Sequence, residues 1–198
     1  MKTLIIISIS IFSSCANAAW KAEYCIDKWD RAKSFHQKAI ENYNSGHRVL
    51  NRQPGRAFDF FNSASSTAST YNYNYRKVYE NCRKSTNITK EMAYKNRDAF
   101  KDLGRSAKCG MKLTSGVKSL LEMEGLVDNF NNAIDNNSAK ATIEDYGFEA
   151  KIKAKSGMEY FKKALRSSDC ADDNSMLNYA ENQYEYLKEN YDFFKQHY

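Results

Sequence analysis

The chain has 198 residues, with one proline, eight glycines, 27% charged residues and a formal net charge of +6. This length suits one domain of ordinary size, and so few prolines and glycines favour long helices over a turn-rich sheet fold. Basic and acidic residues are interspersed along the chain, which is typical of a solvated helical surface and argues against a nucleic-acid-binding protein.

Residues 1–18 have the organisation of a signal peptide. Lys2 precedes a short apolar run at residues 4–12, and Ala16-Asn17-Ala18 forms a small-residue cleavage site. The apolar run is too short to cross a membrane, which takes about 20 residues. We therefore expect cleavage after Ala18, leaving a single helical domain at 19–198 with no transmembrane segment.

The short signal and its Ala-Asn-Ala ending are typical of bacteria, so a periplasmic or secreted protein is predicted. Two alternatives stay open. Cys15 in Phe12-Ser13-Ser14-Cys15 could be a lipidated cysteine that anchors the chain, or the source could be eukaryotic, with Asn87 and Asn136 in glycosylation triplets.

Four cysteines remain after the predicted cleavage. An even number in an exported chain favours two disulfides over free thiols. No two of them are close enough in sequence to form a CxxC redox motif or a zinc motif. The four are Cys25, Cys82, Cys109 and Cys170.

Apolar residues at alternating spacings of four and three predict a helical hairpin at 20–84. Gln53-Pro54-Gly55 interrupts the spacing as a turn, so the two helices must run antiparallel. Folding at this turn pairs Gly46 with Phe61, His36 with Tyr71, and Cys25 with Cys82. The two stripes are Cys25, Trp29, Ala32, His36, Ala39, Tyr43, Gly46 and Leu50, then Ala57, Phe61, Ala64, Ala68, Tyr71, Tyr75, Val78 and Cys82.

A second hairpin is predicted at 106–170, with a turn at 135–138 and Ser138 as a helix cap. Its register sets Gly116 against Phe161. Cys170 lies two residues past the register of Cys109 and comes within reach if the last turn unwinds, so we predict a disulfide between them. The two stripes are Cys109, Leu113, Gly116, Leu120, Met123, Val127, Phe130 and Ile134, then Ile143, Gly147, Ala150, Ala154, Gly157, Phe161, Ala164 and Ser168.

Two further helices complete the predicted fold. A linker helix at 88–103 is expected to stop at Gly104, and an aromatic stripe predicts a C-terminal helix at 173–198, whose alternative role is a detachable helix that binds a partner. The fold class is therefore all-α: an elongated bundle of about five helices, built from two disulfide-closed antiparallel hairpins plus a C-terminal helix. Both disulfides are expected at the same end, and residues beside the stripes are expected to bury between the hairpins: Ile26, Phe35, Ile40, Phe58, Leu121 and Leu126.

The sequence contains no catalytic motif. A phosphate-binding loop, a nucleotide fingerprint, a nucleophile elbow, an HExxH pair and a covalent-haem signature are all missing. No spacing places two of the three histidines on one helical face, and His36 is expected to be a hydrogen-bonded core residue. We therefore expect no enzymatic activity, no cofactor and no metal.

Five aromatic residues outside the stripes are candidates for an interaction surface, because tyrosine buries a large area and keeps a polar tip. Their alternative role is a second layer of core. We expect an exported, non-catalytic protein-binding module, such as an inhibitor or an immunity-type protein acting on an envelope or toxin partner. The alternatives are a structural or assembly component of an envelope secretion or conjugation machine, and a small-ligand carrier. The five residues are Tyr73, Tyr94, Tyr160, Tyr186 and Phe193.

Overall fold

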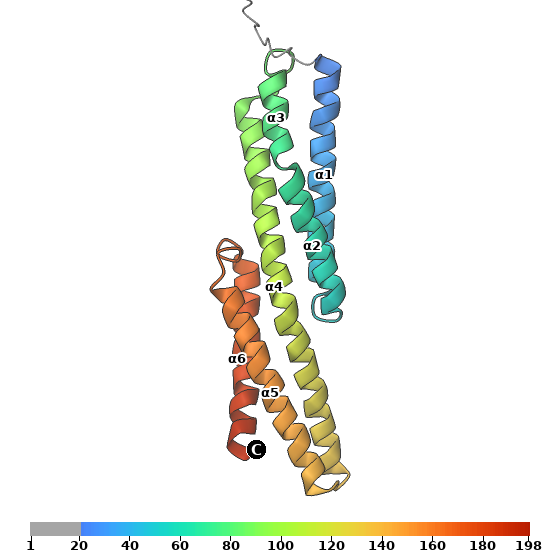
Figure 1. Ribbon diagram of the computed structural model, residues 1–198, viewed down its shortest axis with the longest axis vertical. Helices are drawn as coiled ribbons and strands as arrows, with labels where there is room; N and C mark the ends of the chain where they lie inside the picture. The colour runs from blue at the N-terminus through green and yellow to red at the C-terminus, as the bar shows by residue number, and fades with distance from the viewer. Residues whose placement is uncertain (1–20) are drawn as a thin grey trace, which may run out of the picture.

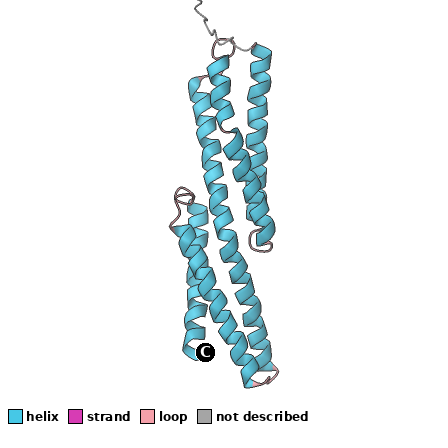
Figure 2. Cartoon of the chain, in the orientation of Figure 1, coloured by secondary structure: helices cyan, strands magenta, loops and turns pink. Residues whose placement is uncertain are grey.

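The computed structural model describes residues 21–198, so the predictions about residues 1–18, including the lipidation of Cys15, lie outside the described part. The described chain is all-α, with no strand (Figure 2). Its helices are α1 (Ala22–Val49), α2 (Pro54–Tyr71), α3 (Tyr73–Cys82), α4 (Lys90–Asp135), α5 (Lys140–Leu165) and α6 (Asn174–His197). Since only Asn72 separates α2 from α3, the architecture is one of five helical arms, as predicted.

Helix α4 runs through the whole length of the molecule and packs against every other arm (Figure 1). Its 46 residues extend about 69 Å at 1.5 Å per residue. The first half of α4 packs with α1, α2 and α3, and the second half packs with α5 and α6. The fold is therefore an elongated rod of two three-arm bundles that share one helix, and we call these the first and second bundles.

The first bundle buries most of the residues that the spacing predicted, whereas His36, Tyr43 and Tyr71 are half-buried. Trp29, Tyr75 and Val78 are almost fully buried, and Cys25 is joined to Cys82. Burying such a face on both helices is what stabilises an amphipathic hairpin in water. The arm bends at Asn72, whose side-chain amide donates a hydrogen bond of 2.7 Å to the carbonyl oxygen of Ala68 and so competes with the helical pattern.

The second bundle packs large residues against glycines. Phe161 packs directly against Gly116, as the register predicted. A Cβ added to Gly116 would lie 2.9 Å from the ring of Phe161. Cys109 is joined to Cys170. Helix α4 ends at Asp135. Just beyond it, Asn137 adopts a positive φ of 50°, and Ser138 N–H donates to the carbonyl oxygen of Ala133, a common way for helices to end.

The predicted end of the linker helix at Gly104 is wrong. Helix α4 continues through this glycine because the residue allows a close helix contact: a Cβ there would lie 2.9 Å from Cβ of Ala68. The prediction that both disulfides lie at one end is wrong for the same reason. Cys109 lies 19 residues beyond the start of α4 at Lys90, about 29 Å along its axis, whereas Cys25–Cys82 lies at the end of the rod (Figure 1).

Several smaller predictions also need correction. Tyr75, and not Tyr71, shares a hydrogen bond with His36, at 3.3 Å, since Tyr71 stacks on Phe35 instead. Ile26 and Phe58 are exposed, because the two hairpins follow one another along α4 and meet only where the tip of the first reaches the second bundle. Ile134 is exposed at the tip of the second bundle, and the residue at the N-cap of α5 is Ala139 and not Ser138.

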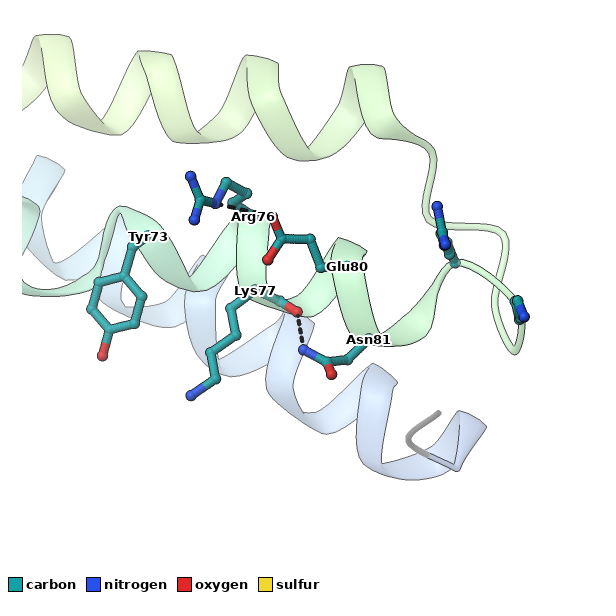
Figure 3. A pocket seen from close by; sticks show the side chains of 7 residues that line it. Tyr73, Arg76, Lys77, Glu80 and Asn81 are labelled. Atoms are coloured by element: carbon teal, nitrogen blue, oxygen red, sulfur yellow. Dashed lines mark hydrogen bonds and ion pairs between the residues drawn. The ribbon is translucent and has the colours of Figure 1, made fainter. Parts of the chain in front are cut away.

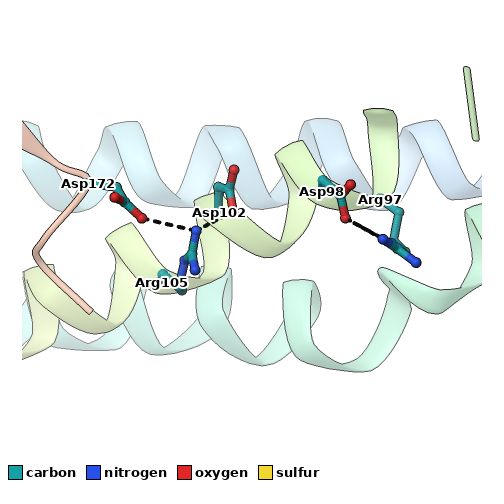
Figure 4. A network of polar contacts seen from close by, with 5 residues as sticks. All are labelled: Arg97, Asp98, Asp102, Arg105 and Asp172. Carbon is teal, nitrogen blue, oxygen red and sulfur yellow. Dashed lines mark hydrogen bonds and ion pairs between the residues drawn. The ribbon is translucent and has the colours of Figure 1, made fainter. Parts of the chain in front are cut away.

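Polar contacts hold the two bundles together where they meet. Tyr43 of α1 donates a hydrogen bond of 2.7 Å to Asp173, the N-cap residue of α6, and Tyr179 of α6 donates one of 2.5 Å to Asn51. Arg105 of α4 pairs with Asp172 at 3.1 Å (Figure 4). One apolar cluster also extends across this junction from the tip of the first hairpin into the second bundle. The bundles are thus joined by side chains as well as by α4.

Candidate interaction surface

Charge is divided unevenly along the rod. Residues 20–100 contain 15 basic and 8 acidic residues, a net charge of +7, whereas residues 101–198 contain 14 basic and 16 acidic residues, a net charge of −2. Because 21–100 form α1, α2, α3 and the start of α4, the positive charge gathers on the first bundle. Although basic and acidic residues are interspersed along the sequence, the folded molecule is therefore dipolar, with its positive end at the first bundle.

A groove lies on the first bundle between α1 and the α2–α3 arm. Its volume is about 400 Å³. Phe35 and Tyr71 stack face to face in it, with ring centroids 3.8 Å apart. Tyr24, which is 46% exposed, forms its outer edge. The groove is lined by Tyr24, Lys28, Arg31, Phe35, Tyr71, Asn74, Lys77 and Val78.

A second hollow, with a volume of about 520 Å³, continues from this groove along the outer side of α3. Lys77 lines both hollows, and Tyr73 projects from the same helix one turn earlier (Figure 3). Arg83 and Lys84, which follow the end of α3, complete its basic lining. The hollow and the groove together form one surface, which we call the basic–aromatic surface.

The cations of this surface are available to a partner. Among residues 21–198, Lys28, Arg31 and Lys77 form no ion pair, and Lys28 instead lies over the ring of Tyr24 at 4.8 Å. Arg76 is the exception, since it pairs with Glu80 at 3.1 Å. A cation without a carboxylate partner can form a charge-assisted hydrogen bond with an incoming anion without first breaking an internal one. The surface is therefore suited to a negatively charged partner.

The five aromatic residues proposed from the sequence do not form one surface. Tyr73, 53% exposed, belongs to the basic–aromatic surface. Tyr94 is half-buried against Tyr79 with Arg97 over its ring, so it belongs to the packing of the first bundle. The other three are exposed on the second bundle: Tyr160 on α5, and Tyr186 and Phe193 on α6.

Most residues of the groove were missed by the sequence argument. Phe35 was expected to be buried between hairpins and Tyr71 to face His36, and neither Lys28 nor Arg31 was singled out. A signal was nevertheless present: Tyr24, Lys28, Arg31 and Phe35 follow spacings of four, three and four on one side of α1. The uneven division of charge was the second signal.

The titratable groups in the interior are placed for structural roles. Burial lowers the pKa of His36 and raises the pKa of Tyr75 to about 12, so both are neutral at pH 7 and share a hydrogen bond. Burial also raises the pKa of Asp173, but hydrogen bonds from Tyr43 and from the N–H of Met176 outweigh it and bring that pKa below its usual value. No group of three metal-binding side chains occurs among the described residues.

Comparison with known proteins gives no relative for this chain. No family model, no curated protein and no solved structure matches it. No helix within residues 21–198 is long and apolar enough to cross a membrane. The two disulfides fit a protein that folds in an oxidising compartment.

Proposed function

We propose that this chain is an exported, non-catalytic protein-binding module of the cell envelope that holds a negatively charged partner on its basic–aromatic surface. The observation that carries the proposal is the groove of stacked Phe35 and Tyr71, edged by three cations that form no ion pair with any residue from 21 to 198. Aromatic anchors flanked by arginine and lysine have the composition of binding hot spots. An inhibitor or an immunity-type protein would use such a surface to hold its target.

The architecture supports this role. Two disulfides, each closing a loop of about 60 residues, together with a continuous α4, keep the basic–aromatic surface ordered before a partner arrives. Such ordering removes part of the entropic cost of association. The predicted signal peptide and the two disulfides support a periplasmic location for this module.

An assembly role in an envelope machine is the second candidate, and the observation that favours it is the rod itself. The two bundles follow each other along α4 and carry net charges of opposite sign. A small-ligand carrier has less support, because the groove between α1 and the α2–α3 arm is open and lies on the surface of the rod.

Site-specific photo-crosslinking tests the proposal. A benzophenone amino acid replaces Tyr24 at the edge of the groove, and the matched control replaces Tyr160, which is 39% exposed on the second bundle. In cells that express the protein, irradiation should join a distinct envelope protein to position 24 and not to position 160. Identical products from both positions, or no product from position 24, would count against the proposed surface. The Lys77→Glu variant should reduce the yield at position 24.

A further inference from the structure

We infer that the basic–aromatic surface of one copy binds the outer face of α6 of a second copy, so that the protein associates head to tail. This inference names one partner of the surface described above and therefore rests on the proposed function. It joins the positive first bundle of one rod to the negative second bundle of the next.

The outer face of α6 has the chemistry that the groove requires. Tyr186 and Phe193 are 42% and 48% exposed and lie seven residues apart, so both project from one side of the helix. Glu189 lies between them, is exposed, and forms no ion pair within residues 21–198. Asp192 adds a second exposed carboxylate beside Phe193. Within the described part of the chain, the outer face of α6 thus presents two exposed aromatic side chains and two exposed carboxylates that form no ion pair.

The two faces have the same order of groups, with charged residues between two aromatic ones, but carry opposite charges. On α1, Tyr24 and Phe35 flank Lys28 and Arg31 over eleven residues, about 16 Å along the helix. On α6, two aromatic residues flank Glu189 over seven residues, about 10 Å. The shorter acidic pattern fits within the longer basic one, with the carboxylate of Glu189 beside the cations. The attraction between Glu189 of one copy and the cations of the other would determine how far α6 is shifted along α1.

The pairing must occur between copies. Figure 1 shows α6 beside the half of α4 that lies away from α3, so the groove and α6 of one chain cannot meet. The two surfaces are also different from each other, which makes the contact heterologous. A heterologous contact that does not close into a ring produces an open chain of copies. One helix in one groove is a small interface, so we expect association that depends on protein concentration and on salt.

Sedimentation velocity on the purified protein tests this inference. The weight-average mass should rise with protein concentration at about 0.01 M salt and fall to that of one chain at about 1 M, where the Debye length shrinks from about 30 Å to 3 Å. Lys77→Glu and Glu189→Lys should each weaken association by about tenfold or more. The matched controls Lys155→Glu and Glu159→Lys change exposed residues of α5 that form no ion pair with other described residues, and should leave association unchanged.

Mixing two alanine variants gives the sharpest result. Lys77→Ala keeps an intact α6 and Glu189→Ala keeps an intact groove, and neither introduces a charge that could pair with the other variant. An equal mixture should therefore stop at pairs of one copy each and form no longer chains. A protein that stays monomeric at every concentration and salt would overturn the inference. If a different envelope protein is still crosslinked at position 24, the proposed function survives that result. Self-association unaffected by either variant would also overturn it.

Discussion

Phe61 lies between two glycines, so replacing either glycine by a larger residue should destabilise the fold. Its ring is fully buried between Gly46 of α1 and Gly110 of α4. A Cβ at either glycine would lie 2.7 Å from a ring carbon, whereas carbon atoms pack best at about 3.5–4.0 Å. In Gly110→Ala the ring would have to move by about 1 Å, and the backbone of α1 at Gly46 blocks that movement.

The magnitude follows from two opposing contributions. Overpacking a well-filled core costs about 1–3 kcal/mol, and this site belongs at the upper end because the ring is held on both sides. Replacing a helical glycine by alanine recovers about 1 kcal/mol. The free energy of unfolding of Gly110→Ala should therefore fall by about 2 kcal/mol. In Gly125→Ala, on the same helix, nothing lies within 4 Å of the new Cβ, so that variant should gain about 1 kcal/mol.

Urea unfolding followed by circular dichroism measures both variants. The transition midpoints should move in opposite directions at an unchanged dependence on urea, since the surface exposed on unfolding stays the same. In a Phe61→Leu background the smaller side chain should reduce the cost of Gly110→Ala, and the double-mutant cycle reports that coupling. Equal stabilisation by Gly110→Ala and Gly125→Ala would refute the packing of Phe61 described above.

Three further predictions concern the disulfide, the helix cap and the junction. Replacing Cys25 and Cys82 together by serine should lower the free energy of unfolding by about 4 kcal/mol in the chain-entropy model, measured by urea unfolding with and without reductant. Thr89→Ala removes the hydroxyl that caps α4 and should cost about 1 kcal/mol, seen as a lower melting temperature. Because Asp173 has a pKa below its usual value in the folded chain, its contribution to stability is present above about pH 4 and is lost as the pH falls through the folded-state pKa. Tyr43→Phe removes one of its hydrogen bonds and should weaken this acid dependence, measured as unfolding free energy against pH.

The spacing of apolar residues predicted pairings wherever one helix face meets one partner. Gly46 with Phe61, Gly116 with Phe161, and both cysteine pairs follow from the period of the helix and the position of two turns. These are local patterns, and the burial of one face per helix is enough to determine them. The prediction was weaker at the tips, where Ile134 has the spacing of a core residue but no neighbour to cover it.

The continuity of α4 could not be predicted in this way. A glycine near the end of an apolar stripe fits both a helix end and a close contact, and only the position of Ala68 decides between them for Gly104. The groove could not be predicted for a similar reason. Phe35 and Tyr71 form one surface only when α1 and the α2–α3 arm lie side by side, which a local pattern does not determine. Their place on a positively charged bundle could have been noticed, since the division of charge is present in the sequence itself.

The helix shared by both bundles has a mechanical consequence. Two bundles joined by a loose linker would rotate independently, which is the usual behaviour of neighbouring domains. Here a pull on the end that carries Cys25–Cys82 is transmitted along the hydrogen-bonded backbone of α4 to the tip near Asp135. The protein should therefore act as a stiff spacer that sets the distance between whatever is bound at its two ends.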